Sequence, residues 1–296
     1  MENWIGGEAG VSYQEERKRI DGHEVTALTF PALTATGIVS HAFSTRLGGV
    51  SQGPYAQMNL GLSRNDRPKA VRENYRLMAA FLGRKPEDVT ISYQTHTSTV
   101  RVVTEEDRGK GLTRERDYRD VDGLVTNVPG IVLTTLHADC TPLYFVDPVR
   151  RAIGLAHSGW RGTVGRIGRE TVRAMQETYG SDPADLVAVI GPSICGCCYE
   201  VGAEVAEAFF DEFGKESCLE AGILREGGLA RQIAPDKYRL DLWAANALLL
   251  QQAGITGEHL HISRLCTCEN SALLFSHRAV RGGERGNLAA FLSLEA

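Results

Sequence analysis

Three side chains that can bind a metal ion lie at the ends of predicted strands. His96 comes just before one apolar run, Cys140 follows a second, and His157 ends a third. Zinc favours imidazole nitrogen and thiolate sulfur, and catalytic zinc sites use three protein ligands and leave a fourth position open. We therefore predict a mononuclear zinc site formed by His96, Cys140 and His157. Their spacing matches no compact motif, and a single buried His or Cys is usually a packing residue, so only the fold can bring them together.

The segment that begins at His157 is typical of an anion-binding turn. It reads HSGWRGT and runs from a predicted strand into a predicted helix. The first backbone N–H groups of a helix lack partners within the helix and attract anions. Gly159 and Gly162 would permit close approach of a ligand, and Arg161 would add a positive charge, so we predict that these three residues bind phosphate. The alternative is a glycine-rich turn with a surface arginine.

Other polar residues near these segments are candidates for catalysis or substrate binding. Arg46 can match phosphate oxygens with its planar fork of donors, and Ser44 can add a hydroxyl group. Asp139 precedes Cys140 and could carry a proton or orient a ligand. The alternative for Asp139 is a cap on the turn after the strand. No role is assigned to His137, which shares a face with Asp139 only if the strand continues.

Five further cysteines fall into two short clusters. Cys195, Cys197 and Cys198 lie in ICGCC, and Cys266 and Cys268 lie in LCTC. Four of these thiols could form a structural zinc site, although Cys-x-Cys spacing is unusual for one. We interpret them mainly as buried thiols, with metal binding and a redox or disulfide role as alternatives.

The apolar pattern alternates short strands with amphipathic helices. In residues 66–83, Val71, Tyr75 and Met78 fall on one helical face, and Gly83 ends the helix. Residues 48–61 and 226–236 are expected to be loops, and the charged stretch 104–120 is expected to be solvated. The predicted strands span residues 24–30, 38–45, 100–103, 131–136, 143–146, 152–158, 186–191, 259–263, 272–275 and 289–294, and the other predicted helices span 163–179, 201–213 and 237–254.

These elements predict a mixed α/β (α+β) fold, a layered sandwich of mixed β-sheets covered by helices in a single domain. Of the 296 residues, 43% are hydrophobic and 23% are charged, which suits a folded domain with a sizeable core. We expect an N-terminal extension over residues 1–23 and one catalytic domain over residues 24–296.

Charge and hydropathy exclude several classes of partner. The formal net charge of -5 does not favour nucleic acid, whose binding needs a concentrated basic face. No apolar stretch approaches the roughly 20 residues of a membrane span. The N-terminus lacks the basic start and apolar run of a signal peptide. We therefore expect a cytoplasmic protein that binds neither nucleic acid nor membrane, with its cysteines mostly reduced. The sequence does not predict the oligomeric state.

Several longer segments carry a resemblance to a known protein family. They are HAFSTRLGGVSQGPYAQMNLG, QTHTSTVRVV, DGLVTNVPGIVLTTLHADCTPLYFVDP, AIGLAHSGWRGTVGRI, IGPSICGCCYEVG, LDLWAANALLLQQAGI and FSHRAVRGGERGNLAAFLSL. With ADC, HSGWRGT and STRLGGVS in these relative positions, the chain resembles the YfiH family, also called the polyphenol oxidase or laccase-domain family. The resemblance covers nearly the whole chain from residue 24 onward.

The resemblance implies both a site and an activity. It implies that His96, Cys140 and His157 are the metal ligands and that Asn59 contacts a nucleoside. The implied enzyme cleaves adenosine, inosine or methylthioadenosine with phosphate and deaminates adenosine to inosine. Its partners would be a purine nucleoside and phosphate, with zinc as the cofactor. The older laccase label implies Cu2+ and phenol oxidation instead.

Two other enzyme classes and one binding class are alternatives. Laccase chemistry needs many imidazoles, and the eight His include one His-x-His pair, His259 and His261. A hydrolase that uses Cys140 as nucleophile and His157 as base would look similar in the sequence, and the family has been linked to editing of peptidoglycan precursors. The third alternative is a metal-binding interaction module without catalysis.

Overall fold

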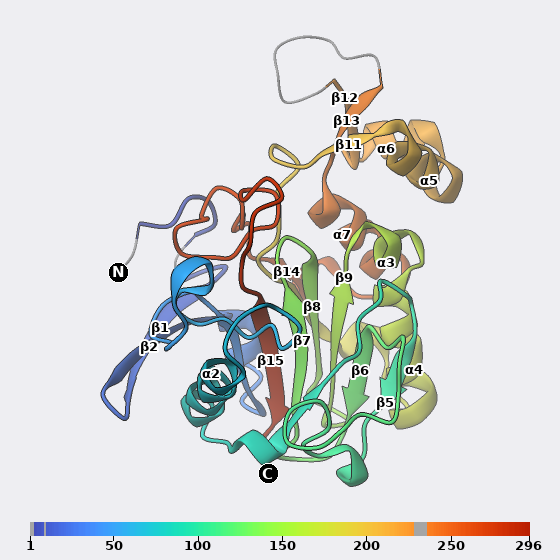
Figure 1. Ribbon diagram of the computed structural model, residues 1–296. Coiled ribbons are helices and arrows are strands. Elements are labelled where there is room, and N and C mark those ends of the chain that lie inside the picture. The colour runs from blue at the N-terminus through green and yellow to red at the C-terminus, as the bar shows by residue number, and fades with distance from the viewer. Residues whose placement is uncertain (1–2, 9, 228–235) are drawn as a thin grey trace.

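Two six-stranded β-sheets lie face to face, and helices cover their outer faces (Figure 1). The structure is a computed structural model in which residues 3–8, 10–227 and 236–296 are described. A small three-stranded sheet with helices beside it lies at the top of the view in Figure 1. This layered sandwich of mixed sheets in a single domain confirms the predicted fold class.

The two large sheets are mixed. The first has the strand order β1-β2-β3-β15-β7-β4, and the second has β14-β10-β8-β9-β6-β5. The pairs β4–β7, β5–β6 and β10–β14 are parallel, whereas the other neighbours are antiparallel. The bounds in chain order are β1 Gln14–Ile20, β2 His23–Thr29, β3 Val39–Ser44, β4 Val89–Ile91, β5 Val100–Val102, β6 Gly123–Thr126, β7 Val132–His137, β8 Thr141–Asp147, β9 Ala152–Ser158, β10 Val187–Ile190, β14 Leu260–Ile262 and β15 Leu288–Leu294.

The helices and the small sheet complete the fold. The α-helices are α1 Pro31–Thr34, α2 Pro68–Phe81, α3 Trp160–Val164, α4 Ile167–Tyr179, α5 Ala203–Phe213, α6 Lys215–Glu220 and α7 Leu242–Gln252. Short 3₁₀ helices are η1 Gly53–Tyr55, η2 Pro86–Asp88, η3 Glu105–Asp107, η4 Pro183–Asp185 and η5 Gly257–His259. The small sheet has the order β11-β13-β12, with β11 Glu200–Gly202, β12 Leu224–Glu226 and β13 Lys237–Leu240. None of the helices in the described ranges is long and apolar enough to cross a membrane.

Strand β15 contributes to two cores because successive side chains of a strand point to opposite faces. Leu288, Ala290 and Leu292 lie in the core between the two large sheets. Ala289 and Phe291 lie in the core between the first sheet and α2. The apolar run predicted as the last strand therefore stabilises three adjacent layers at once.

The second sheet follows the same alternation. Tyr144 and Val146 of β8 point into the core between the sheets. Leu143 and Phe145 point to the opposite face, where residues such as Met175 of α4 cover them. The resulting four-layer arrangement fixes β8 and β9 at the centre of the molecule, and the ends of these strands carry the candidate site.

Two predicted helices have different bounds in the structure. Residues 163–179 form the two helices α3 and α4, because the backbone at Arg166 is left-handed, with φ of 58°, and interrupts the helical path. Residues 237–254 begin as strand β13, and α7 begins only after Asp241. The Asp241 side chain accepts two backbone N–H bonds from the first turn of α7, which defines its start.

One other expectation about elements is wrong, and a second holds only in part. Residues 272–275 form turns rather than a strand, and the apolar pattern reflects the burial of Leu274 and Phe275. The stretch 104–120 is not fully solvated, because Lys110 is 7% exposed and its ammonium lies 2.8 Å from the carboxylate of Asp107. A buried charge needs such a partner, which a list of charged residues does not reveal.

The predicted N-terminal extension contains β1, which forms the edge of the first sheet and pairs with β2. Its sequence QEERKRI is charged, as is common for an edge strand, and periodicity therefore missed it. The domain boundary after residue 23 falls within the β1–β2 hairpin and stays a prediction. The loop expected over residues 226–236 lies mostly outside the described residues.

Candidate metal centre

Three segments bring His96, Cys140 and His157 to one place. Their ligand atoms all lie within 4.8 Å of one another, and Cys140 Sγ is 3.9 Å from His96 Nε2. His96 lies between β4 and β5, Cys140 lies in the turn between β7 and β8, and His157 belongs to β9. The turn with Cys140 crosses from the first large sheet to the second, and the pairing of β8 with β9 places Pro142 opposite His157. The structure therefore brings the three predicted ligands together.

A buried carboxylate orients both histidines. Asp122, which is fully buried, accepts a hydrogen bond from His157 Nδ1 at 2.8 Å. It also accepts the backbone N–H groups of Thr95, His96 and Thr97 at 3.0, 3.1 and 3.0 Å. Metal-ligating histidines usually donate their second ring nitrogen to such a carboxylate, which fixes the tautomer. Sequence reasoning missed both this residue and the strand β6 that follows it, and the only signal was an acidic side chain directly before the short apolar segment GLVT.

The charges within the group favour a thiolate beside an imidazolium when no metal is bound. Burial opposes ionisation of Cys140, but His157 and His96 outweigh it and lower the pKa of the thiol to about 6. Burial also opposes protonation of His157, but Cys140 and Asp122 raise its pKa to about 9. A metal ion would replace the proton held between these groups, because it requires a thiolate and a neutral imidazole.

The donor set and its surroundings fit a zinc ion. Two imidazole nitrogens and one thiolate sulfur match the ligands of catalytic zinc, which leave one position open. Gly159 makes room for this group, because a Cβ at this position would lie 2.9 Å from Cys140 Sγ and 2.9 Å from His96 Cδ2. The close approach, rather than backbone conformation, therefore requires glycine here.

Two residues of the site have left-handed backbones without being glycine. The φ angles are 66° for His96 and 88° for Asp139. Such conformations cost energy and are kept where surrounding contacts enforce them, which is common at functional sites. The Asp139 carboxylate accepts a bond from the Thr267 hydroxyl at 2.6 Å and one from the Arg278 backbone N–H at 2.6 Å. Asp139 thus fixes the backbone next to Cys140.

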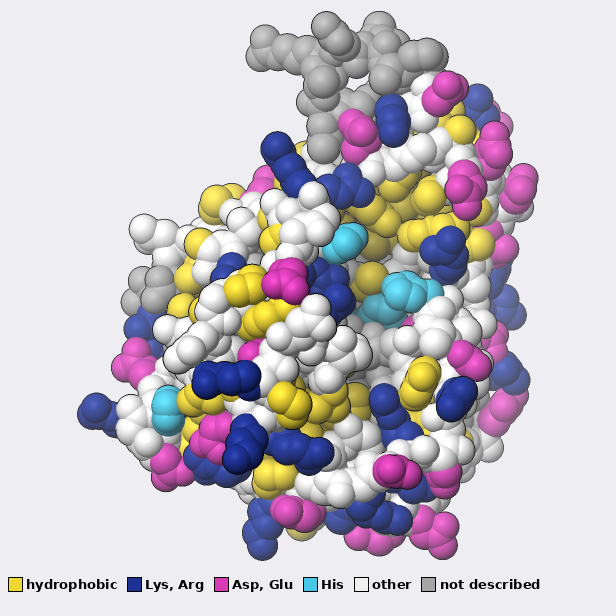
Figure 2. Space-filling view, viewed as in Figure 1, with side chains coloured by type: hydrophobic (Ala, Val, Ile, Leu, Met, Phe, Trp, Pro, Cys, Tyr) yellow, Lys and Arg dark blue, Asp and Glu magenta, His cyan; other side chains and the backbone are white. Residues whose placement is uncertain are grey.

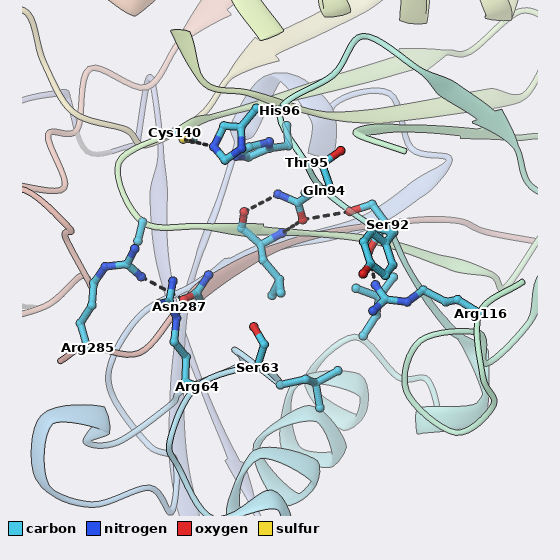
Figure 3. Close-up of a pocket in the computed structure, with 16 residues that line it drawn as sticks. Ser63, Arg64, Ser92, Gln94, Thr95, His96, Arg116, Cys140, Arg285 and Asn287 are labelled. Carbon is cyan, nitrogen blue, oxygen red and sulfur yellow. Dashed lines mark hydrogen bonds between the residues drawn. The ribbon is translucent and has the colours of Figure 1, made fainter. Parts of the chain in front are cut away.

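A cavity of about 490 Å³ opens directly at the metal-ligand group (Figure 3). In Figure 3, Arg285 and Arg116 lie on opposite sides of the cavity, and Arg64 lies across it from His96. Figure 2 shows histidine side chains beside a hollow on this face, with Lys and Arg side chains next to them. The lining residues are Leu62, Ser63, Arg64, Ile91, Ser92, Tyr93, Gln94, Thr95, His96, Arg116, Leu136, Ala138, Cys140, His157, Arg285 and Asn287.

Two arginines in this cavity share one neutral partner. Arg64 Nε and Arg285 Nη1 donate to the same oxygen, Oδ1 of Asn287, at 2.8 and 2.9 Å. Burial and the charge of Arg64 lower the pKa of Arg285 to about 10. The Nε atom of Arg285 is buried and has no hydrogen-bond partner within the described part of the chain. Two adjacent positive charges with unused donors are suited to an anion.

A second cavity of about 180 Å³ borders the same metal-ligand group. His96 and Cys140 line both cavities, whereas Asp139 and Arg161 line only the second among the five cavities found in the described ranges. The Arg161 guanidinium lies 4.2 Å from the centre of the Trp160 ring and is exposed to solvent. Of the residues predicted to bind phosphate, Arg161 is thus placed near the metal centre.

The structure places Ser44, Arg46 and Asn59 in supporting positions rather than in the lining of either cavity described above. Ser44 is fully buried, and its hydroxyl accepts the Ala289 N–H at 2.9 Å. The Arg46 guanidinium donates to the carbonyl oxygens of Ala56 and Ser271 at 3.0 and 2.8 Å. Their predicted contact with substrate stays a prediction.

Asn59 and His137 support the site from behind its lining. Asn59 is fully buried, and its Oδ1 accepts the backbone N–H of Asn287, which lines the larger cavity. His137 is buried, and its two ring nitrogens lie 3.0 Å from the Cys140 carbonyl oxygen and 2.7 Å from the Thr135 hydroxyl. Gly162 lies in α3, where an added Cβ would be 3.4 Å from the His157 carbonyl oxygen.

Comparisons with known proteins give the chain its relatives. A purine nucleoside phosphorylase of Deinococcus radiodurans is 41% identical over 271 residues, covering 91% of this chain and 95% of that protein. Purine nucleoside phosphorylase YlmD of Bacillus subtilis is 38% identical over 257 residues, covering 86% of this chain and 87% of that protein. The crystal structure of YlmD from Geobacillus stearothermophilus matches with a TM-score of 0.84 and 34% identity, over 97% of this chain and 100% of that chain.

Two further findings identify the family. The crystal structure of the Bacillus licheniformis hypothetical protein YfiH matches with a TM-score of 0.83 and 33% identity, over 94% of this chain and 99% of that chain. The family model described as multi-copper polyphenol oxidoreductase laccase matches residues 40–295. The chain therefore belongs to this laccase-like YfiH family.

Proposed function

We propose that this protein is a zinc-dependent purine nucleoside phosphorylase. The observation that carries the proposal is the juxtaposition of the His96, Cys140 and His157 group with an arginine-lined cavity of about 490 Å³. The relatives named purine nucleoside phosphorylase support the same reaction class. We propose adenosine, inosine and methylthioadenosine as substrates, together with phosphate.

His96, Cys140 and His157 would hold the zinc ion, and Asp122 would hold the imidazole of His157 and the backbone of His96 in position. Zinc held there would supply Lewis-acid chemistry to an oxygen atom at its open position. Asp122 accepts the Nδ1 proton of His157, so the other ring nitrogen is free to bind a metal once it has lost its own proton. Cu2+ is the alternative ion for the same three ligands, and elemental analysis of the purified protein distinguishes the two.

The phosphate would bind between Arg64 and Arg285. In phosphorolysis a phosphate oxygen bonds to C1′ of the ribose as the C1′–N9 bond breaks, and the base leaves with the electron pair and takes up a proton. Arg64 and Arg285 converge on Asn287 and carry charges that no carboxylate in the cavity lining balances. Guanidinium groups bind phosphate oxygens in pairs, which would orient the attacking oxygen. Arg161, at the second cavity, is a further candidate, and Arg46 would act through the loop that it supports.

The test is an assay of base release. Purified protein loaded with zinc should release hypoxanthine from inosine and adenine from adenosine only when phosphate is present, with ribose 1-phosphate formed in equal amount. A chelator should abolish the release and zinc should restore it. Zinc-loaded protein that releases no base from any of the three nucleosides in phosphate would refute the proposal.

We propose adenosine deamination as a second activity of the same centre. His96 and Cys140 border two cavities, so substrates bound on different sides can reach one metal position. In this reaction water adds at C6 of adenine and ammonia leaves. Asp139 lines the second cavity beside Cys140 and is the candidate proton carrier. Adenosine without phosphate should then yield inosine and ammonia, whereas zinc-loaded protein that yields neither would refute this activity.

One observation favours a different candidate, a hydrolase with Cys140 as the nucleophile. Without metal, the lowered pKa of Cys140 and the raised pKa of His157 favour a thiolate–imidazolium pair of the kind used by cysteine hydrolases. The two candidates respond differently to reagents. Chelation should abolish the activity of a zinc enzyme. Activity that survives chelation and is abolished by alkylation of Cys140 would favour the hydrolase.

The described part of the chain does not offer the cluster of histidines that multicopper laccase chemistry needs. Within the described ranges, two groups of His, Cys, Asp or Glu side chains are close enough to share a metal ion, and neither contains more than two histidines. His259 uses Nδ1 to contact the Ala184 carbonyl oxygen at 2.8 Å. The His-x-His pair is thus outside both groups, which supports a mononuclear centre over a multicopper one.

A further inference from the structure

A cluster of thiols outside the candidate metal centre has the composition of a metal site. The sulfur atoms of Cys195, Cys198 and Cys266 all lie within 4.8 Å of one another. Cys195 is 7% exposed, Cys266 is 1% exposed, and Cys198 is half-buried. Cys268 is half-buried and packs with Cys198 against the side-chain cluster that contains Cys195 and Cys266, which brings a fourth sulfur to this part of the molecule. These four cysteines line neither of the two cavities at the candidate metal centre.

Backbone hydrogen bonds hold the two cysteine-bearing loops in register. The Ser193 N–H donates to the Leu265 carbonyl oxygen at 3.2 Å, and the Thr267 N–H donates to the Ser193 carbonyl oxygen at 3.1 Å. Within the first loop, the Cys198 N–H donates to the Cys195 carbonyl oxygen at 3.0 Å, which closes a turn. The turn returns the second thiol of a Cys-x-x-Cys segment to the side of the first, and this spacing is common in structural zinc sites.

The backbone around Cys266 is arranged to stabilise negative charge on its sulfur. The Cys195 backbone N–H donates to the Cys266 sulfur at 3.3 Å. Three sulfur atoms within 4.8 Å of one another cannot all be thiolates without a cation, because like charges this close repel each other. A divalent cation would remove that conflict.

We propose that Cys195, Cys198 and Cys266, with Cys268 as the fourth ligand, bind a structural zinc ion separate from the candidate metal centre. An all-sulfur donor set on two loops is typical of closed zinc sites, which stabilise a fold and bind no substrate. On binding, each thiol releases its proton to solvent as its sulfur–metal bond forms. The ion would tie residues 193–199 to residues 265–268.

Both tied loops contact the residue next to Cys140, because the Ile194 backbone N–H in the first loop donates to the Asp139 carbonyl oxygen at 3.0 Å. Thr267 lies between Cys266 and Cys268, and its hydroxyl donates to Asp139 Oδ1 at 2.6 Å. Asp139 precedes Cys140 in the chain. The proposed ion would therefore stabilise the loop that holds Asp139, while contributing no ligand to the first site.

The test counts zinc ions per chain in protein purified with a reductant. Wild-type protein should contain two, Cys140→Ala should contain one, and Cys198→Ser should contain one. Cys197→Ser is the matched control, because Cys197 is exposed and lies outside the cluster, and it should contain two. One ion that persists in Cys140→Ala would support the thiol site even if the first site bound none.

A spectroscopic readout covers the case in which a serine variant does not fold. Cobalt added to metal-free Cys140→Ala should give intense sulfur-to-metal charge-transfer absorption and the visible bands of tetrahedral cobalt. Zinc that is wholly lost in Cys140→Ala, an absent charge-transfer band, or a disulfide among these cysteines in reduced protein would each overturn the proposal.

Discussion

The substitution Asp122→Asn should weaken metal binding without removing a metal ligand. The carboxylate accepts the Nδ1 proton of His157 at 2.8 Å and the backbone N–H of His96 at 3.1 Å through one oxygen, and its other oxygen accepts the N–H groups of Thr95 and Thr97 at 3.0 Å. An amide keeps one acceptor oxygen and turns its own N–H donors toward groups that are themselves donors. One side of this arrangement must therefore lose its bonds.

The size of the effect depends on whether the amide oxygen of the substituted side chain faces His157 or faces the backbone N–H groups of Thr95 and Thr97. Partners of metal-ligating histidines typically change metal affinity by about 10- to 100-fold, which corresponds to about 1.4–2.7 kcal/mol. The lower end applies if the amide oxygen still accepts from His157, because water can reach the exposed Thr95 and replace the other oxygen. The upper end applies if the amide N–H faces His157, because the ring must then carry its proton on the nitrogen that binds metal.

The assay is zinc affinity measured by competition with a chelator of known strength. Asp120→Asn is the matched control, because Asp120 is exposed and its carboxylate accepts a hydrogen bond from the Thr95 hydroxyl at 2.7 Å rather than from a histidine. The control should bind zinc as the wild type does. An Asp122→Asn protein that is folded and binds zinc with wild-type affinity would refute the positioning role of this carboxylate.

Three further predictions concern the same centre. Gly159→Ala should lose zinc and activity, because its Cβ would lie 2.9 Å from the Cys140 sulfur. Gly202→Ala is the control, because no atom lies within 4 Å of the added Cβ, and it should retain both. Elemental analysis and base-release assays measure the two properties. In metal-free protein the Cys140 thiol should react with iodoacetamide above pH about 6, because its lowered pKa makes it a thiolate there, and the reaction should slow below that pH. Bound zinc should protect the thiol. The reaction is followed by mass spectrometry at several pH values, and a reaction that began only near pH 9 would contradict the prediction. Arg285→Ala should raise the KM for phosphate at least about tenfold, which is the scale of one lost charge-assisted hydrogen bond, and should affect the KM for inosine less. Arg281→Ala, at an exposed position, should change neither KM. A KM for phosphate that is the same in Arg285→Ala as in the wild type would exclude Arg285 from the anion site.

Periodicity predicted the strands that build the sandwich, because alternating burial is strong along strands such as β15. It failed where tertiary contacts decide the outcome. Leu274 and Phe275 form a buried turn that has the same apolar composition as a strand, and β1 is a charged edge strand. The start of α7 depended on Asp241, whose capping role is visible only once the preceding residues are known to be extended.

The grouping of His96, Cys140 and His157 was predictable from donor chemistry together with the family resemblance, whereas the residues that support the group were not. Asp122 is a single acidic residue, and its role arises because the backbone N–H groups of residues 95–97 all donate to its carboxylate. Arg64 and Arg285 meet on Asn287, although Arg64 and Asn287 are 223 positions apart in the chain. No local pattern signals such a meeting. Arg46, which a local pattern did suggest, donates instead to backbone carbonyl groups.

The most direct test of the central claim is anomalous diffraction at the zinc absorption edge from crystals grown with zinc. The account predicts a peak bound by His96, Cys140 and His157 at about 2.0–2.3 Å from each ligand atom, with its free side toward the arginine-lined cavity. An anomalous zinc peak elsewhere in the molecule, with none among these three side chains, would contradict the account.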